Sequence, residues 1–418
     1  MKVVGIIAEY NPFHNGHKYQ IDSIRKKTGA DYIIVAMSGN FLQRGVPAFC
    51  DKYTRTRMAL TCGADLVLEL PTLWASASAE YFAKGGVTLL ANTGVVTHLG
   101  FGAENDALTT MQTIASLLNE EPDEYKQALN VALKEGKSFP QARTQALLST
   151  LSSDADSSIN IEKITQLLNF PNNILALEYL KALPATIEPI LIPRKGAGYH
   201  DTDMDSILPS ASAIREYITR SSADFKDKQL DNAIPTVIYN IFQDIVQRNA
   251  YLTTNDLTEI LGFCLLTLRQ NGYAQYLDCN EELSNKIQKN LSNYTSFDSF
   301  CQSLKSKDLT YTRISRCLLH ILLGITTADA KKAMHTNMAP YLRVLGFKKD
   351  ASTLLTAIKK EANVPLITKV ADAAALLHED AYAIFEKDIY ASSIYYQLLA
   401  TKKGQAPANE YTQQIVIL

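Results

Sequence analysis

The chain has 418 residues, of which 46% are hydrophobic and 20% are charged, and its formal net charge is −2. This length predicts two or three domains, and the composition is typical of a globular protein that builds its core without disulfides or metals. The net charge excludes a chain that is basic throughout, and no apolar run of about eighteen residues could span a membrane. Six scattered cysteines without a CxxC pair, and no signal peptide, predict a cytoplasmic protein.

The first predicted element is the strand Val3–Ala8, a β-branched run that ends in a polar turn. A helical pattern begins near Asn15, so His14 and His17 lie where the strand passes into the helix. Residues three apart on a helix can face the same side. The first amides of a helix have no intrahelical partner and attract phosphate, and Gly16 leaves room for a phosphate to approach the backbone. The sequence therefore predicts a phosphate site here.

Strands and helices then alternate along the first half of the chain. We predict further buried strands over 31–37, 64–70, 95–101 and 187–192, and intervening helices over 51–61, 76–90 and within 170–183. Such alternation indicates a Rossmann-like, doubly wound parallel sheet. The polar turns that carry the candidate residues each follow one of these strands, so they should meet at the carboxyl edge of the sheet, where ligands bind.

Beyond residue 224 the hydrophobic periodicity becomes helical, which predicts an α/β domain over 1–222 and an all-α domain over 233–418. Within this second part, residues 305–369 contain twelve Lys and Arg but four Asp and Glu. Aromatic residues accompany several of these cations, a pattern that suits contact with an RNA backbone and stacking on bases. A solvated charged face is the alternative. The candidate RNA contacts are Arg313, Arg316, Arg343, Lys348 and Lys349.

The segment HNGH at 14–17 resembles the HxGH signature of the nucleotidyltransferase superfamily. The longer segments AEYNPFHNGH and SGNFLQRG resemble more closely one family, the tRNA(Met) cytidine acetate ligases. A surface turn or half of a zinc site is the alternative, but zinc needs further ligands and no other His or Cys precedes Cys50. We predict no metal-ligating residues.

The resemblance implies a set of ATP contacts. The loop after the first strand would wrap the nucleotide, and it comprises Ile7, Ala8, Glu9, Tyr10, Asn11, Pro12, Phe13, His14, Asn15, Gly16, His17, Lys18, Tyr19 and Gln20. Later contacts would be Gly102, Asn173, Arg194, Ser210 and Ser212, with Arg215 supplying a forked cation to the phosphates. The choices between Asn172 and Asn173, and between Arg194 and Lys195, stay open. The alternatives are that Asn172 or Asn173 caps the helix within 170–183, that Ser210 or Ser212 is a plain helix cap, that Gly102 is a turn glycine, and that Arg194 pairs with Glu188 or Asp201 on the surface.

A second substrate would meet the turn after the second strand. There Ser38, Asn40, Gln43 and Arg44 are candidates to orient a small carboxylate, and a polar surface loop is the alternative. The resemblance implies that acetate attacks the α-phosphorus of ATP, with His14, His17 and Arg215 as catalytic residues. The acetyl group of the resulting acetyl-adenylate would then pass to the exocyclic amine of the wobble cytidine of elongator tRNA(Met). No general base for this transfer is identifiable from the sequence.

Two other functions would account for part of this sequence. A small-molecule nucleotidyltransferase, forming a dinucleotide-type cofactor, would share the HxGH chemistry but would not need a basic helical domain. A non-catalytic RNA-binding protein would leave the histidine pair unexplained. The sequence leaves open whether Mg²⁺ accompanies ATP, and it does not set the oligomeric state.

Overall fold

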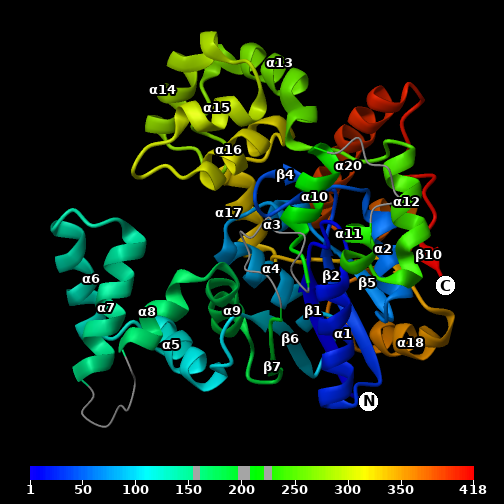
Figure 1. The fold of residues 1–418 in the computed structure, drawn as a ribbon, viewed down its shortest axis with the longest axis horizontal. Helices are drawn as coiled ribbons and strands as arrows, with labels where there is room; N and C mark the ends of the chain where they lie inside the picture. The colour runs from blue at the N-terminus through cyan, green and yellow to red at the C-terminus, as the bar shows by residue number, and fades with distance from the viewer. Residues whose placement is uncertain (154–160, 196–207, 221–227) are drawn as a thin grey trace.

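The computed structural model describes residues 1–153, 161–195, 208–220 and 228–418 (Figure 1). Its centre is an eight-stranded sheet in the order β10-β8-β5-β2-β1-β6-β7, with β9 pairing beside β8. The strands are β1 (Val3–Ala8), β2 (Tyr32–Ser38), β5 (Leu66–Leu70), β6 (His98–Ala103), β7 (Glu188–Pro193), β8 (Leu342–Phe347), β9 (Leu366–Ile367) and β10 (Val416–Ile417). The short strands β3 (Phe41–Leu42) and β4 (Val46–Pro47) form a separate hairpin.

The helices of the first half are α1 (Asn15–Thr28), α2 (Lys52–Thr61), α3 (Thr72–Ala75), α4 (Ala79–Ala91), α5 (Leu108–Glu120), α6 (Asp123–Lys134), α7 (Phe139–Ser153), α8 (Ile161–Asn169), α9 (Pro171–Ala182) and α10 (Ala211–Arg220). Those of the second half are α11 (Lys228–Ala233), α12 (Tyr239–Gln247), α13 (Thr258–Leu268), α14 (Glu281–Asn290), α15 (Phe297–Leu304), α16 (Tyr311–Leu323), α17 (Thr327–His335), α18 (Ser352–Glu361), α19 (Ala373–Leu376) and α20 (Glu379–Lys403).

The predicted doubly wound sheet is confirmed. Strands β5, β2, β1, β6 and β7 run parallel to one another, with β1 between β2 and β6. The chain therefore builds outward from β1 through β2 to β5, and then returns to the other side of β1 to form β6. This reversal of strand order leaves a crevice at the carboxyl ends of β1 and β6, where doubly wound sheets bind ligands.

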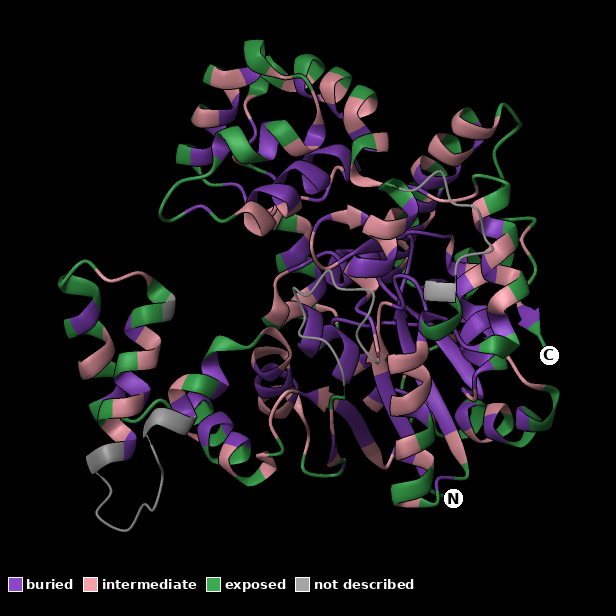
Figure 2. Ribbon diagram, viewed as in Figure 1, coloured by how far each residue is buried: buried purple, intermediate pink, exposed green. Residues whose placement is uncertain are grey.

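Alternate residues of each strand pack on opposite faces of the sheet. Val4 and Ile6 of β1 belong to the core beneath α1 and α2, whereas Val3 belongs to the core beneath α4. The strands are accordingly buried between two helical layers (Figure 2). The sheet is thus a rigid platform for the turns at its carboxyl edge.

Helices α5 to α8 form an insertion between β6 and β7, seen at the left of Figure 1. The helix that follows, α9, begins at Pro171 with Phe170 at its N-cap position. The expectation that Asn172 or Asn173 caps this helix is therefore wrong, because both lie within its first turn. Proline at the first helical position sets the start instead.

The C-terminal part is mainly helical, as predicted, but it also contributes strands to the central sheet. β8 pairs antiparallel with β5, and β10 pairs parallel with β8. The apolar core of the sheet continues into the helices of this part through residues such as Leu342, Val344 and Leu318. The proposed end of the first domain at residue 222 lies outside the described residues. Among the described helices, none is both long and apolar enough to cross a bilayer.

Candidate active site

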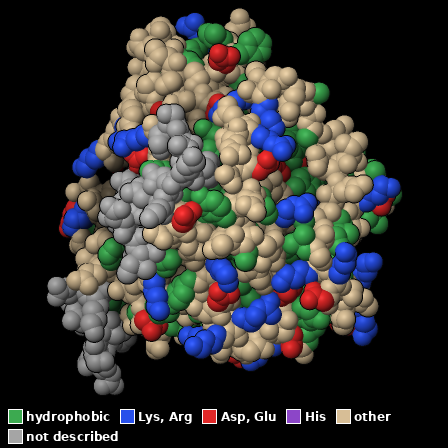
Figure 3. All heavy atoms as spheres, turned by 45° about the vertical axis from the view of Figure 1, so that its right-hand side comes forward, with side chains coloured by type: hydrophobic (Ala, Val, Ile, Leu, Met, Phe, Trp, Pro, Cys, Tyr) green, Lys and Arg blue, Asp and Glu red, His purple; other side chains and the backbone are tan. Residues whose placement is uncertain are grey.

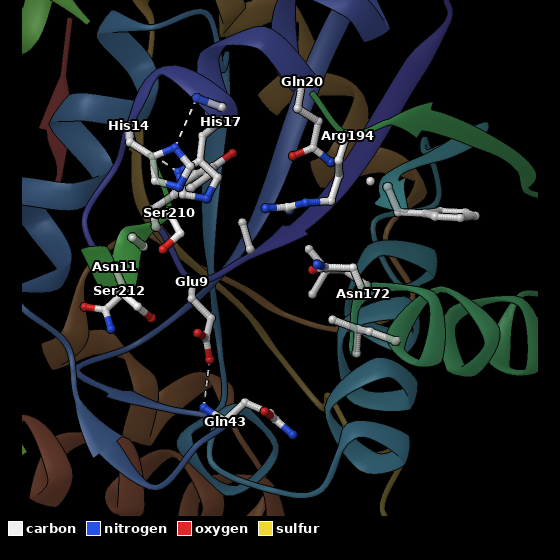
Figure 4. A pocket seen from close by; sticks show the side chains of 18 of the residues that line it. Glu9, Asn11, His14, His17, Gln20, Gln43, Asn172, Arg194, Ser210 and Ser212 are labelled. Carbon is white, nitrogen blue, oxygen red and sulfur yellow. Dashed lines mark hydrogen bonds between the residues drawn. The ribbon is translucent and has the colours of Figure 1, made fainter. Parts of the chain in front are cut away.

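A cavity of about 210 Å³ lies at the carboxyl edge of the sheet, over the crevice between β1 and β6. Its walls come from the loop after β1, the turn between β3 and β4, the ends of β6 and β7, and the starts of α9 and α10. In Figure 4, His14, His17 and Ser210 lie on one side and Arg194, Gln20 and Asn172 on the other. Glu9, hydrogen bonded to Gln43, lies apart from both groups.

Two imidazoles cap the N-terminus of α1. His14 Nδ1 accepts a hydrogen bond from the backbone N–H of Gly16 at 3.0 Å, and His17 Nδ1 accepts one from the backbone N–H of His14 at 3.3 Å. The two rings stack with their centroids 3.8 Å apart. Because Nδ1 is the acceptor in each neutral ring, the proton must sit on Nε2. Both histidines can therefore donate an Nε2–H to a ligand beside them.

Both imidazoles are held in their neutral form. Burial, with the positive charges of Arg194 and Arg215 acting in the same direction, lowers the pKa of His14 to about 3. Burial also places the pKa of His17 well below its ordinary value, with His14 and Arg194 acting in the same direction. At neutral pH these groups are hydrogen-bond donors without charge, and an anion bound beside them would raise their affinity for a proton.

Gly16 has a second role beside the predicted one. A Cβ atom at this position would lie 2.8 Å from Cε1 of His14 and 3.0 Å from its Nδ1. The glycine therefore leaves room for the capping ring of His14, and room for a phosphate at this position stays a prediction. Its missing side chain sets the place of an imidazole that lines the cavity.

The start of α10 supplies a second set of donors. Ser210 caps this helix by accepting from the N–H of Ala213 at 3.1 Å, and it also lines the cavity, so it fits both its cap and its ligand interpretation. Arg215 donates to the backbone oxygen of Asn11 and to Ser212 Oγ, the latter at 3.2 Å. The SASAIR segment is thus tied to the loop after β1, and Ser212 and Arg215 both line the cavity.

Most of the predicted ATP loop lies where it was expected. Ten of its fourteen residues line the cavity. The other four do not: Phe13 is buried in the core, Lys18 pairs with Asp22, Asn15 donates to Asn232, and Pro12 is also absent from the lining.

The opposite wall contains Gly102, Arg194 and an apolar surface. Arg194 runs over Gly102, where a Cβ atom would meet its side chain at 3.4 Å. Asn173, the predicted contact, is fully buried and accepts from the N–H of Glu104, whereas its neighbour Asn172 lines the cavity. The apolar residues of this wall were not predicted, because nothing local distinguishes them from core: Phe82, Phe101, Leu175, Tyr179 and Ile192.

Only half of the predicted carboxylate pocket faces the cavity. Gln43 and Arg44 line it, from the turn between β3 and β4. Ser38 and Asn40 are buried, and Asn40 Oδ1 accepts from the N–H of Lys52 at 2.9 Å. Neither residue lines the cavity, and the side chain of Asn40 instead holds the start of α2.

The structure contradicts one predicted RNA contact. Arg343 lies on β8, is 1% exposed, and forms ion pairs with Glu69 and Glu410. Lys52 joins the same buried cluster through these two carboxylates. Arg343 therefore ties the C-terminal part to the sheet and cannot reach RNA.

The other four candidates lie on two separate surfaces. Arg313 and Arg316 lie on α16, which packs against the turn at Gly45, where Ser315 Oγ donates to the Gly45 oxygen. Arg316 is 11% exposed and pairs with Asp278 at 2.8 Å. Lys348 and Lys349 follow β8 at the amino edge of the sheet, opposite the cavity, because β8 runs antiparallel to β5.

The positive segment 305–369 therefore does not form one basic surface. Five of its twelve cations are in ion pairs, most of them with acidic residues from outside the segment. On the face shown in Figure 3, Lys and Arg side chains are interspersed with Asp and Glu. Within the part of the chain that the structure describes, no three His, Cys, Asp or Glu residues gather in a way that could hold a metal ion.

Comparison with known proteins identifies the family to which the chain belongs. A family model described as HIGH Nucleotidyl Transferase matches residues 1–410. The tRNA(Met) cytidine acetate ligase of Acetivibrio thermocellus is 35% identical over 422 residues, covering 100% of both chains. That of Clostridium kluyveri is 40% identical over 375 residues, covering 88% of this chain and 90% of the relative. The chain belongs to the tRNA(Met) cytidine acetate ligase family.

Solved structures of the family have the same fold over their whole length. The apo crystal structure of Thermotoga maritima TmcAL superposes with a TM-score of 0.92 at 30% identity, covering 100% of both chains. The structure of the same protein bound with alpha-thio ATP gives a TM-score of 0.90 at 29% identity, again over 100% of both chains. The strands that the C-terminal part adds to the sheet therefore lie within the region that superposes on Thermotoga maritima TmcAL.

Proposed function

We propose that this chain is an ATP-dependent ligase that acetylates the exocyclic amine of the wobble cytidine of elongator tRNA(Met). Acetate is activated first as acetyl-adenylate, and the product is N-acetylcytidine. One observation carries the proposal. Two neutral imidazoles, His14 and His17, present Nε2–H donors from the start of α1 into the cavity at the carboxyl edge of the sheet.

In the first step the carboxylate oxygen of acetate attacks the α-phosphorus and pyrophosphate leaves. The substrate is itself the nucleophile, so the protein needs donors placed where phosphate charge grows. The described residues offer the two imidazoles, the capped start of α10, and the guanidinium groups of Arg194 and Arg215. Neutral donors suit this step because they bind the growing charge without holding the ground state as tightly as a full cation would.

The two ends of the cavity suit two different substrates. The wall formed by Gly102, Arg194 and the apolar side chains fits the adenosine of ATP. The turn carrying Gln43 and Arg44 fits acetate, because a guanidinium and an amide offer donors to a carboxylate. Glu9 is the one acidic side chain among the described residues of the lining, so the protein offers few ligands to Mg²⁺. The phosphate oxygens of ATP would therefore supply most of the ligands of a Mg²⁺ ion that binds with the nucleotide.

The tRNA would approach over α16, which packs directly against the same turn. Arg313, half-buried on the first turns of this helix, is the retained candidate for a phosphate contact there. The cytidine must leave its stack to reach the cavity. The reaction belongs in the cytoplasm, a compartment that suits six cysteines that are all free thiols.

Mass spectrometry of tRNA nucleosides tests the proposal. Incubation of elongator tRNA(Met) with the protein, ATP and acetate should produce N-acetylcytidine, and omission of ATP or acetate should abolish it. A transcript whose wobble cytidine is replaced by uridine should remain unmodified. Transfer of adenylyl groups to a small nucleotide, without any need for acetate, would instead favour a cofactor-forming nucleotidyltransferase.

A further inference from the structure

A single carboxylate, that of Glu9, faces the cavity from the part of the chain that the structure describes. Glu9 follows β1 and is half-buried. Its Oε1 accepts a hydrogen bond from the backbone N–H of Gln43 at 2.8 Å (Figure 4). For Oε2, no hydrogen bond is found within the described ranges. One oxygen of this side chain is therefore engaged by the protein and the other is open to a ligand.

The other polar groups of the described lining are poorly suited to accept a proton. His14 and His17 use their Nδ1 lone pairs to cap α1, and their Nε2 atoms already carry hydrogen. Burial raises the pKa of Tyr10 far above neutrality, so its phenol keeps its proton. The lining otherwise contains tyrosine, lysine and arginine side chains, and at neutral pH these residue types ordinarily already carry their proton.

The positive charges of three arginines act on the Glu9 carboxylate. Arg44 lies on the turn between β3 and β4, Arg55 on α2 and Arg215 on α10. Arg55 also donates to the backbone oxygen of Glu9 at 2.7 Å. Their charges offset a carboxylate in a cavity that must admit ATP and acetate, both anions. Burial outweighs them and raises the pKa of Glu9, which brings it toward the range where a carboxylate can take up a proton at neutral pH.

We propose that Glu9 is the general base of acetyl transfer, a role that rests on the function proposed above. The amine nitrogen of cytidine attacks the carbonyl carbon of acetyl-adenylate, so a C–N bond forms. The bond from that carbon to the phosphate oxygen breaks, and AMP leaves with its electron pair. The proton lost by the nitrogen passes to Oε2 of Glu9 and then to water. Until this proton is removed, the protonated amine leaves the tetrahedral intermediate more readily than AMP does, and the intermediate reverts to acetyl-adenylate.

The Glu9→Gln variant separates this role from a structural one. The amide oxygen of Gln can still accept from Gln43, so the turn should keep its place, but the amide cannot take up a proton. Acetyl-adenylate should be formed first on the protein with ATP, acetate and pyrophosphatase, and tRNA added for a single turnover. We expect transfer to fall at least about a hundredfold more than acetate-dependent pyrophosphate exchange, the usual worth of a general base.

Glu104→Gln is the matched control. Glu104 is also half-buried, accepts from the N–H groups of Asn172 and Asn173, and does not line the cavity. Its replacement should leave the ratio of the two rates unchanged. In the unsubstituted protein, transfer should slow as the pH falls through the pKa of Glu9, and this limb should be missing from Glu9→Gln.

Other outcomes overturn the inference in distinguishable ways. Transfer within about threefold of the unsubstituted protein at every pH would show that Glu9 takes no proton. A proportionate loss of both half-reactions would assign Glu9 to ATP, its metal or the turn. If the unsubstituted protein shows neither acetate-dependent exchange nor acetyl transfer, the proposed function fails, and the role of Glu9 fails with it.

Discussion

Replacing Gly16 with alanine should damage the activity of this protein without damaging its fold. The new Cβ atom would lie 2.8 Å from Cε1 of His14, whereas carbon atoms in contact settle at about 3.5–4.0 Å. The ring must therefore move by roughly 0.7 Å or more. This shift would stretch its 3.0 Å hydrogen bond with the Gly16 N–H beyond the usual range.

Two effects on stability nearly cancel. A lost helix cap costs about 1 kcal/mol, and alanine in place of glycine within a helix gains about 0.5–1 kcal/mol. The unfolding free energy should therefore change by less than about 0.5 kcal/mol. A catalytic group displaced by about 1 Å can lose roughly a hundredfold in rate, so acetate-dependent turnover should fall about 10- to 100-fold.

Thermal or denaturant unfolding and turnover should be measured on the same preparations. Gly404→Ala provides the opposite control, because Gly404 has a φ of 62° and its Cβ would meet nothing within 4 Å. Strain should lower its stability by about 1 kcal/mol and leave turnover intact. Full turnover by Gly16→Ala would refute the assignment of His14 to the phosphates, and a large loss of stability would show that the glycine serves the backbone instead.

Four further predictions follow from the same contacts. His14→Ala and His17→Ala should each lower turnover about 100- to 1,000-fold while ATP binding changes little, as measured by kinetics and calorimetry. His14 binds a proton less readily in the folded protein than in the unfolded chain, so the free energy of unfolding should fall as the pH drops below about 6.5, by about 2 kcal/mol at pH 5. Denaturant titrations should show that His14→Ala makes this dependence on pH weaker. Arg313→Glu should weaken tRNA binding in filter assays and reduce its salt dependence, whereas Lys349→Glu, at the opposite edge of the sheet, should not; equal effects would contradict the proposed approach. Glu410→Gln should cost about 3–5 kcal/mol in unfolding free energy, because it leaves the buried cations Lys52 and Arg343 short of one counter-charge, and a loss under 1 kcal/mol would disprove this.

The sheet and the histidine site were predictable because their signals are local. The run Val3–Ala8 forms a strand by its own composition, and it ends where the helix pattern begins at Asn15. The parallel strands then bring the following turns to one edge whatever their distance in sequence. The residue-by-residue assignments at later contacts were less certain. A shift of one place on α9 separates Asn172, in the cavity, from Asn173, in the core.

The strands of the C-terminal part could not be seen locally. Leu342–Phe347 is a short apolar run whose partner, β5, lies far away in the sequence. Arg343 was interpreted as a surface charge for the same reason, since its counter-charges are Glu69 and Glu410. Likewise the net charge of residues 305–369 gave no information about which of its cations are paired or which edge of the sheet they occupy.

The paired imidazoles of His14 and His17 should activate acetate on ATP before any tRNA binds. Exchange of labelled pyrophosphate into ATP, measured with and without acetate and in the absence of tRNA, reports this step alone. We predict exchange that requires acetate and that falls at least about a hundredfold in His17→Ala, whose fold is checked by thermal melting. Exchange that proceeds equally without acetate, or that survives in His17→Ala at the level of the unsubstituted protein, would show that these imidazoles do not activate acetate.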